Sequence, residues 1–253
     1  MQVAVITGGS SGIGRSAAFE VAKRGVAVVL TYHGSRERGL EAVERIEKGG
    51  GTAVALPLDV GRPETFAEFR SELTGVLERW GRTSFDFLVS NAGVGQPPVM
   101  FEDTTEDLFD QMLNVHLKGP YFLTQTLLPL IADNGSIVYT TSTSALSSAR
   151  PTPGYSVYAS VKGAQMVLTR YLAKELSARG IRVNAVAPGV TRTRLGDDAF
   201  SQHPELIPPI AERTALGRIG EADDLGKVIA FLGSPDSGWI TAQTVEASGG
   251  YEL

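Results

Sequence analysis

With 253 residues, 42% of them hydrophobic, the chain is long enough to bury a large core, and we expect one domain spanning 1–253. The net charge of −5 gives no basis for a nucleic-acid or anionic-membrane partner, and no apolar run reaches the ~20 residues that span a bilayer. The lack of cysteine excludes disulfides, thiolate nucleophiles and cysteine-ligated zinc, and no leader pattern precedes the first strand, so we expect a cytoplasmic protein without a metal site.

Short runs rich in Val and Ile alternate with longer segments of helical pattern. The runs are too short for helices, and several lack alternating polar residues, as strands covered on both faces do. The predicted strands are residues 3–7, 27–31, 53–58, 85–90, 136–140, 181–187 and 244–247. Helices are predicted between them, among them 12–24, 36–48 and 63–80. This alternation predicts an α/β fold, with one doubly wound parallel sheet of about seven strands and helices on both faces.

A glycine-rich turn, Thr7-Gly8-Gly9-Ser10-Ser11-Gly12-Ile13-Gly14, joins the first predicted strand to the first predicted helix. Helix N-terminal amides in such a turn can bind a phosphate group, and glycines leave room for it. The turn also matches the nucleophile elbow of serine hydrolases, with Ser10 as nucleophile and His116 or His203 as partner. We favour dinucleotide binding, because the elbow would precede the strands that normally supply an oxyanion hole. The expected contacts are Gly8, Ser10, Ser11, Gly12, Ile13 and Gly14.

The end of the second predicted strand indicates which dinucleotide is bound. In NAD-binding folds of this kind, an acidic side chain about 20 residues after the glycine turn accepts hydrogen bonds from the ribose. Here the stretch carries His33, Ser35 and Arg36, with no carboxylate before Glu37. Because these three side chains can donate to a 2'-phosphate, we predict NADP as cofactor, with NAD as the alternative.

Tyr158 and Lys162 lie four residues apart in a segment of helical pattern, so they share one face of the helix. A tyrosine with an ordinary pKa of ~10 is a poor base at neutral pH, whereas a nearby ammonium favours the phenolate. We therefore expect Lys162 to lower the pKa of Tyr158 and make it an acid/base. Tyr155 lacks such a partner, because Ala159 occupies the corresponding position.

Further short motifs follow the predicted strands. They are, in chain order, Asp59-Val60, Asn91-Ala92-Gly93, Leu113-Asn114-Val115, Thr141-Ser142, and Pro188-Gly189 followed by Thr191 and Thr193. With the glycine turn and the Tyr158–Lys162 pair, these motifs make the chain resemble, over nearly its whole length, a short-chain dehydrogenase/reductase of the single-domain type.

The resemblance implies hydride transfer between a nicotinamide cofactor and a carbonyl or secondary alcohol. By resemblance, Lys162 also binds the nicotinamide ribose, and Asn114 holds a water that links Lys162 to solvent. The implied catalytic residues are Asn114, Ser142, Tyr158 and Lys162. Cofactor contacts are implied for Asp59 and Val60 at the adenine, for Asn91, Ala92 and Gly93 beside the fourth strand, and for Pro188, Gly189, Thr191 and Thr193 at the nicotinamide.

Three features depart from the family pattern. The spacing from Ser142 to Tyr158 is longer than usual, which makes Ser144 a competing catalytic serine; we prefer Ser142 because it directly follows a strand. The ending 246–250 differs from the usual one and leaves the C-terminal packing in question. Ser11 is neutral where many NADP-dependent members carry a basic residue, so the prediction of NADP depends on residues 33–36.

The substrate is indicated only by the irregular stretch 194–216, which we expect to form a substrate-binding lid. Its apolar residues, with Leu195 among them, could line a pocket for a 3-oxoacyl thioester, since the overall pattern resembles 3-oxoacyl-thioester reductases, or for another ketone. A non-catalytic NADP(H)-sensing protein of the same fold is the alternative. The resemblance also implies a homotetramer formed through the helices 106–127 and 156–178. The possible pocket walls are Leu195, Phe200, Leu206, Ile207 and Ile210.

Overall fold

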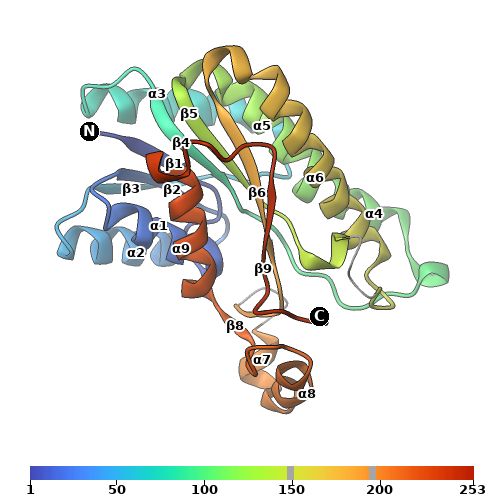
Figure 1. Cartoon of the computed structure of the whole chain (residues 1–253). Coiled ribbons are helices and arrows are strands. Elements are labelled where there is room, and N and C mark those ends of the chain that lie inside the picture. Colours follow the sequence, from blue (N-terminus) through green and yellow to red (C-terminus); the bar gives the residue numbers. More distant parts are fainter. Residues whose placement is uncertain (147–150, 194–197) are drawn as a thin grey trace.

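A seven-stranded parallel sheet forms the centre of the structure, a computed structural model that describes residues 1–146, 151–193 and 198–253 (Figure 1). The strands are β1 (Val3–Ile6), β2 (Ala27–Tyr32), β3 (Ala53–Pro57), β4 (Phe85–Ser90), β5 (Ile131–Thr140), β6 (Arg182–Pro188) and β9 (Thr244–Ala247). Their order is β3-β2-β1-β4-β5-β6-β9, which confirms the predicted doubly wound sheet. The chain changes winding direction between the neighbours β1 and β4, the point where such sheets bind ligands.

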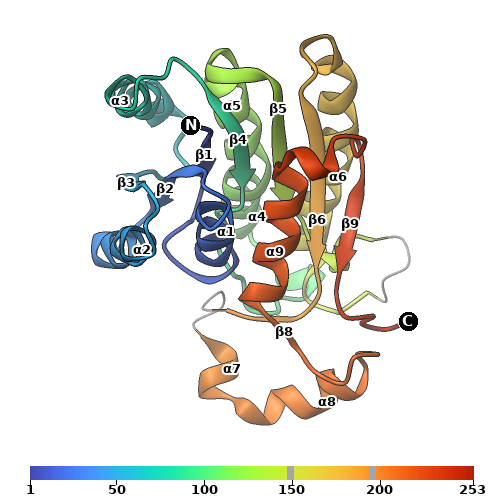
Figure 2. The same cartoon turned by 60° about the vertical axis from the view of Figure 1, so that its left-hand side comes forward.

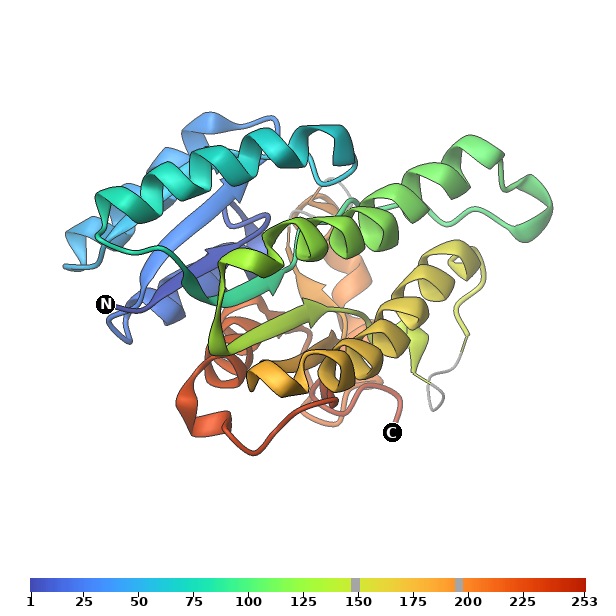
Figure 3. The same cartoon turned by 90° about the horizontal axis from the view of Figure 1, so that it is seen from above.

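Helices cover both faces of the sheet (Figures 2 and 3). One face packs against α1 (Gly12–Ala22), α2 (Arg36–Lys48) and α9 (Ala222–Gly233), and the other against α3 (Phe66–Arg79), α5 (Gly119–Leu127) and α6 (Ser156–Glu175). In β1, Val3 and Val5 face the second layer, while Ala4 and Ile6 face the first. Both faces are therefore apolar, which explains why the strands lack polar alternation.

The expected helix 106–127 is present with one irregularity. It consists of α4 (Glu106–Leu113), a π-helical turn over Asn114–Lys118, and α5. At Gly119, a Cβ would lie 1.9 Å from the carbonyl oxygen of Val60, so the helix approaches the loop after β3 as closely as its backbone allows. Single π turns inside α-helices are frequent at functional sites.

The segment after β6 leaves the body of the protein at the carboxyl end of the sheet (Figure 2). It contains β7 (Thr191–Arg192), α7 (Ala199–Gln202) and α8 (Ile207–Glu212), and β8 (Gly220–Glu221) returns beside β7. The beginning of the expected lid, 194–197 with Leu195, lies outside the described residues.

Among the described helices, none is long and apolar enough to cross a membrane. Short 3-10 turns occur at Pro63–Thr65, Phe101–Asp103, Leu128–Leu130, Thr143–Ala145, Ser177–Arg179, Pro204–Leu206 and Pro235–Ser237.

Candidate active site

A cavity of about 660 Å³ opens at the carboxyl end of β1, β4, β5 and β6, a size typical of small-molecule sites. Of the site residues expected from sequence, Gly14, Ser35 and Arg36 do not line it. Those that do are Gly8, Ser10, Ser11, Gly12, Ile13, His33, Asp59, Val60, Asn91, Ala92, Gly93, Asn114, Ser142, Tyr158, Lys162, Pro188, Gly189, Thr191 and Thr193.

The glycine turn is held against the end of β4. The Asn91 side-chain amide donates to the Thr7 carbonyl at 3.1 Å, and the Asn91 backbone N–H donates to the Thr7 hydroxyl at 2.9 Å. A Cβ on Gly14 would lie 2.4 Å from both the Asn91 amide nitrogen and the Gly8 carbonyl oxygen. Gly14 therefore allows α1 to begin close to β4, while Gly8 and Gly12, with φ of 67° and 52°, shape the turn itself. The result is a cradle of backbone suited to a phosphate group.

The histidines weighed as partners of Ser10 are engaged elsewhere. His203 Nδ1 lies 3.1 Å from a Glu205 carboxylate oxygen on the exposed segment after α7, and His116 is buried beside Val94. No hydrogen bond connects Ser10 to either histidine in the part of the chain that the structure describes. The arrangement gives no support to a nucleophile elbow.

The loops after β2 and β3 form one part of the cavity wall. His33 Nε2 lies 3.6 Å from a carboxylate oxygen of Asp59, and the other Asp59 oxygen accepts from the Gly61 N–H at 2.9 Å. Ser35 caps α2, with its hydroxyl accepting from the Arg38 N–H. Ser35 lines an adjoining hollow together with Arg15 and Arg38. Neither arginine was expected from sequence at this site, although Arg38 lies within the first turn after the cap.

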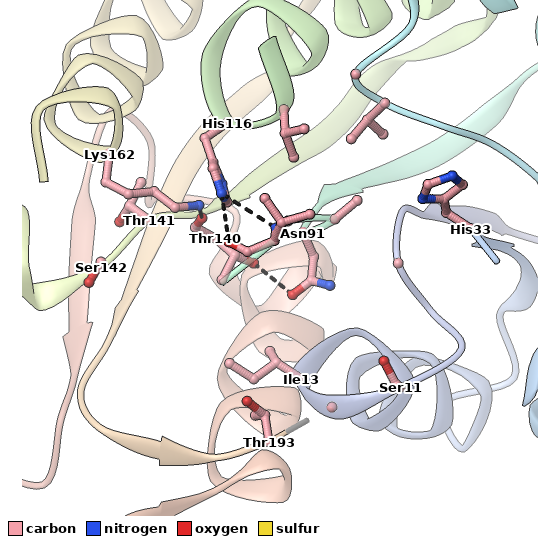
Figure 4. Close-up of a pocket in the computed structure, with 18 of the residues that line it drawn as sticks. Ser11, Ile13, His33, Asn91, His116, Thr140, Thr141, Ser142, Lys162 and Thr193 are labelled. Carbon is pink, nitrogen blue, oxygen red and sulfur yellow. Dashed lines mark hydrogen bonds between the residues drawn. The ribbon is translucent and has the colours of Figure 1, made fainter. Parts of the chain in front are cut away.

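Ser142, Tyr158 and Lys162 lie together beyond the end of β5. Lys162 is buried, and its ammonium nitrogen donates to the Thr140 carbonyl at 2.7 Å (Figure 4). The same nitrogen lies 5.7 Å from the centre of the Tyr158 ring. Ser142 and Ser144 share a hydrogen bond at 2.9 Å, and Ser142 is also the serine that bonds the Tyr158 phenol. The geometry favours Ser142, since Ser144 does not line the cavity.

The expected lowering of the Tyr158 pKa by Lys162 is wrong. Burial raises the pKa of Tyr158 to about 12, and the hydrogen bond from Ser142 opposes this only in part. Burial also lowers the pKa of Lys162 to about 7. The physical reason is that desolvation disfavours the charged form of both groups. At neutral pH, Tyr158 is therefore a neutral phenol, a proton donor.

His116 is a member of the cavity wall that the motifs did not indicate. It is 1% exposed, and its Nε2 lies 2.9 Å from the Val94 carbonyl oxygen. Its ring packs edge-on against the Tyr158 ring, with centroids 5.4 Å apart. Burial lowers the pKa of His116 to about 3, assisted by the nearby Lys162 charge. His116 lies on the π turn, which could not be predicted from sequence.

The segment after β6 forms another part of the cavity wall. The Thr191 hydroxyl donates to the Gly189 carbonyl at 2.9 Å. A Cβ on Gly189 would lie 2.7 Å from the Ser248 Cα, so the C-terminal segment packs directly on this turn. With β9 parallel to β6, the unusual ending 246–250 still packs at the site.

Comparison with known proteins gives the chain a family. The family model described as enoyl-(acyl carrier protein) reductase matches residues 8–252. The 3-oxoacyl-[acyl-carrier-protein] reductase FabG of Staphylococcus epidermidis is 34% identical over 253 residues, covering 98% of this chain and 97% of that protein. The solved promiscuous reductase LugOII, which catalyses keto-reduction at C1 during lugdunomycin biosynthesis, has a TM-score of 0.92 at 34% identity, covering 100% of this chain and 98% of that chain. Landomycin C-6 ketoreductase LanV, solved with bound NADP and rabelomycin, has a TM-score of 0.89 at 32% identity, covering 100% and 96%. The chain therefore belongs to the short-chain dehydrogenases/reductases, a family of oxidoreductases.

Proposed function

We propose that the protein reduces a ketone to a secondary alcohol with NADPH. The observation that carries this proposal is that Ser142, Tyr158 and Lys162 line one cavity together with the glycine turn Gly8–Gly12. Burial keeps the Tyr158 phenol protonated at neutral pH, so the proton that a carbonyl oxygen would need is present in the cavity.

In this proposal, three side chains carry the proton chemistry. The Ser142 hydroxyl donates a hydrogen bond to the substrate carbonyl oxygen and stabilises its developing negative charge. The Tyr158 O–H bond breaks as its proton moves to that oxygen, leaving a phenolate. The Lys162 ammonium stabilises the phenolate, which regains its proton from solvent by way of Lys162 and a water held at Asn114. A bound reduced nicotinamide supplies the hydride that the carbonyl carbon gains.

The cavity suits such a cofactor. The turn with Gly8 and Gly12 would hold the diphosphate, Asp59 and Val60 would flank the adenine, and Pro188 to Thr193 would flank the nicotinamide. NADP is proposed over NAD because no carboxylate stands among residues 33–36 after β2, and because Arg15, Arg38 and Arg192 line the adjoining hollow. Five carboxylates line the same hollow, those of Glu37, Glu41, Asp198, Glu221 and Asp223, so the arginines would have to outweigh them at a 2'-phosphate. LanV, with its bound NADP, supports the same choice.

The proposed substrate class is a ketone with an apolar body, such as a 3-oxoacyl thioester or a cyclic ketone. FabG is named as a 3-oxoacyl-[acyl-carrier-protein] reductase and LanV as a C-6 ketoreductase, and both names support a ketone of this class. We propose that the described part of the expected lid, 198–216, covers the substrate with Phe200, Leu206, Ile207 and Ile210. Leu206 is 44% exposed and so available for a partner.

A cytoplasmic homotetramer is the proposed form of the enzyme. The lack of cysteine suits a reducing compartment. Exposed aromatic side chains, namely Phe109, Tyr121, Phe122 and Tyr171, occur on α4, α5 and α6, which lie side by side in Figure 3. Light scattering after gel filtration should give the mass of four chains.

A panel of ketones tests the proposed function. The panel should include a 3-oxoacyl thioester and a polycyclic ketone, each offered with NADPH and with NADH, and cofactor oxidation should be followed by absorbance. We expect turnover with at least one ketone and a preference for NADPH. Tight NADPH binding without turnover of any ketone would instead indicate a non-catalytic sensor of the same fold.

A further inference from the structure

The lid, 198–216, contains few contacts of its own that could fix its position. From 198 to 213, every residue is exposed or only half-buried, and Thr214 is the first buried residue of the lid. Segments with few buried apolar contacts open at a low cost in free energy. The position of the lid relative to the cavity therefore depends on how its two ends are attached to the body of the protein.

The end at which the lid leaves the body is weakly attached. Strand β7 pairs with β8 over two residues only. Beside this pairing, Arg192 Nε lies 3.1 Å from a Glu221 carboxylate oxygen, and both side chains are exposed. Exposed ion pairs contribute little to stability, because water screens them.

The other end of the lid, 213–216, pairs with residues 248–252 after β9, which we call the C-terminal clamp (Figure 2). A Cβ on Gly250, whose φ is 75°, would lie 2.8 Å from the Ala215 Cβ, so the two segments approach each other closely. Three backbone hydrogen bonds join them, from the Ala215 N–H to the Gly250 carbonyl at 3.1 Å, from the Leu216 N–H to the Gly249 carbonyl at 3.0 Å, and from the Glu252 N–H to the Arg213 carbonyl at 2.8 Å.

An ion pair between Arg213 and Glu252 reinforces this attachment. The Arg213 guanidinium contacts the Glu252 carboxylate, and its Cζ lies 5.1 Å from the centre of the Tyr251 ring. The Glu252 side chain is only 8% exposed, so removal of Arg213 would leave a buried carboxylate without a counter-charge. Glu252 also has a φ of 58°, which non-glycine residues adopt only where surrounding contacts hold them. Since Arg213 is the C-cap of α8, the ion pair acts directly on a helix of the lid.

The C-terminal clamp is in turn attached to the cavity wall. The Ser248 hydroxyl accepts from the Gly250 N–H at 3.1 Å and from the Tyr251 N–H at 3.2 Å. The Ser248 Cα lies 2.7 Å from where a Cβ on Gly189 would be, and Gly189 lines the cavity. The unusual ending 246–250 thus supplies the serine that connects the clamp to the site.

We infer that Arg213 and Glu252 are positioning residues for the substrate. Their ion pair fixes the end of the lid to the C-terminal clamp and holds α8 in the position from which it covers the ketone. Neither residue lines the cavity, so both act through the lid. This inference rests on the proposed function, but the attachment of the lid can be measured without turnover.

Three variants and a control test the effect on the substrate. Glu252→Gln removes the charge with little change of shape, Arg213→Ala removes the guanidinium, and Arg213→Lys keeps the charge. The control Glu44→Gln removes a carboxylate from the exposed Lys48–Glu44 pair on α2. With NADPH, Glu252→Gln and Arg213→Ala should raise the KM for the ketone about fivefold and change kcat by less than about twofold, because a smaller fraction of the protein has its lid in the binding position. NADPH affinity should not change, Arg213→Lys should recover part of the loss, and Glu44→Gln should behave as the wild type.

Amide hydrogen exchange in the ligand-free protein separates the inference from the proposed function. In peptides covering 207–216, Glu252→Gln and Arg213→Ala should exchange about threefold faster or more, with no change in peptides from β1 and β4. Unchanged exchange in 207–216, or faster exchange throughout the protein, would overturn the inference. So would an unchanged KM for the ketone, or a loss of NADPH affinity as large as the loss for the ketone. If the wild type reduces no ketone, the proposed function fails, and the exchange rates still decide whether the ion pair holds the lid.

Discussion

The buried neutral His116 should make the protein sensitive to acid in a way that can be calculated. In the unfolded chain, a histidine has a pKa near 6.5, whereas burial holds that of folded His116 at about 3. Between pH 6.5 and pH 3, His116 binds a proton in the unfolded chain but not in the folded protein. The free energy of unfolding therefore decreases as the pH falls below about 6.5. From pH 7.5 to pH 5 the difference amounts to about 1.5 pK units, or about 2 kcal/mol.

Urea unfolding at these two pH values measures this quantity. The wild type should lose about 2 kcal/mol more stability than His116→Asn on going from pH 7.5 to pH 5, because asparagine does not titrate. Comparing the two proteins cancels the contributions of the other titrating groups. Equal losses in the two proteins would refute the reasoning, since they would mean that His116 is protonated normally in the folded state.

Three further predictions follow from contacts in the site. Gly14→Ala should cost about 1–3 kcal/mol by urea unfolding and weaken NADPH binding, because its Cβ would lie 2.4 Å from backbone oxygen, whereas Gly75→Ala in the open interior of α3 should be neutral or stabilising. Ser142→Ala should lower kcat about 100-fold and Ser144→Ala much less, and equal losses would contradict the choice of Ser142. Arg38→Ala should raise the KM for NADPH about tenfold without changing that for NADH, and equal effects on both cofactors would count against a 2'-phosphate contact.

Most of the fold could be predicted because parallel strands buried on both faces leave uninterrupted apolar runs. Strands β4 and β9 match their predicted ranges. The start of β5 was missed: it begins at Ile131, but Asn134, with φ of 62°, and Gly135 interrupt the apolar pattern and mark a shift in register. The π turn was also missed, because it depends on how closely Gly119 approaches Val60 and not on local sequence.

Residues of the site could be predicted where a sequence motif indicates their chemistry. Properties that depend on burial in the folded protein could not be predicted. The glycine turn and the Tyr158–Lys162 pair were indicated by residue types and spacing, and Ser142 by the family resemblance; all of them line the cavity. The pKa values could not be predicted, because desolvation dominates the shifts of both Tyr158 and Lys162, and residue spacing gives no information about desolvation.

The central claim is that the Tyr158 phenol delivers the proton in ketone reduction. The most direct test is Tyr158→Phe, measured for kcat with the best ketone and for NADPH affinity by fluorescence titration. The variant should lose kcat by a factor of about 100 to 10,000 and bind NADPH nearly as the wild type does, because only the proton donor is removed. A variant that kept wild-type kcat would contradict the claim.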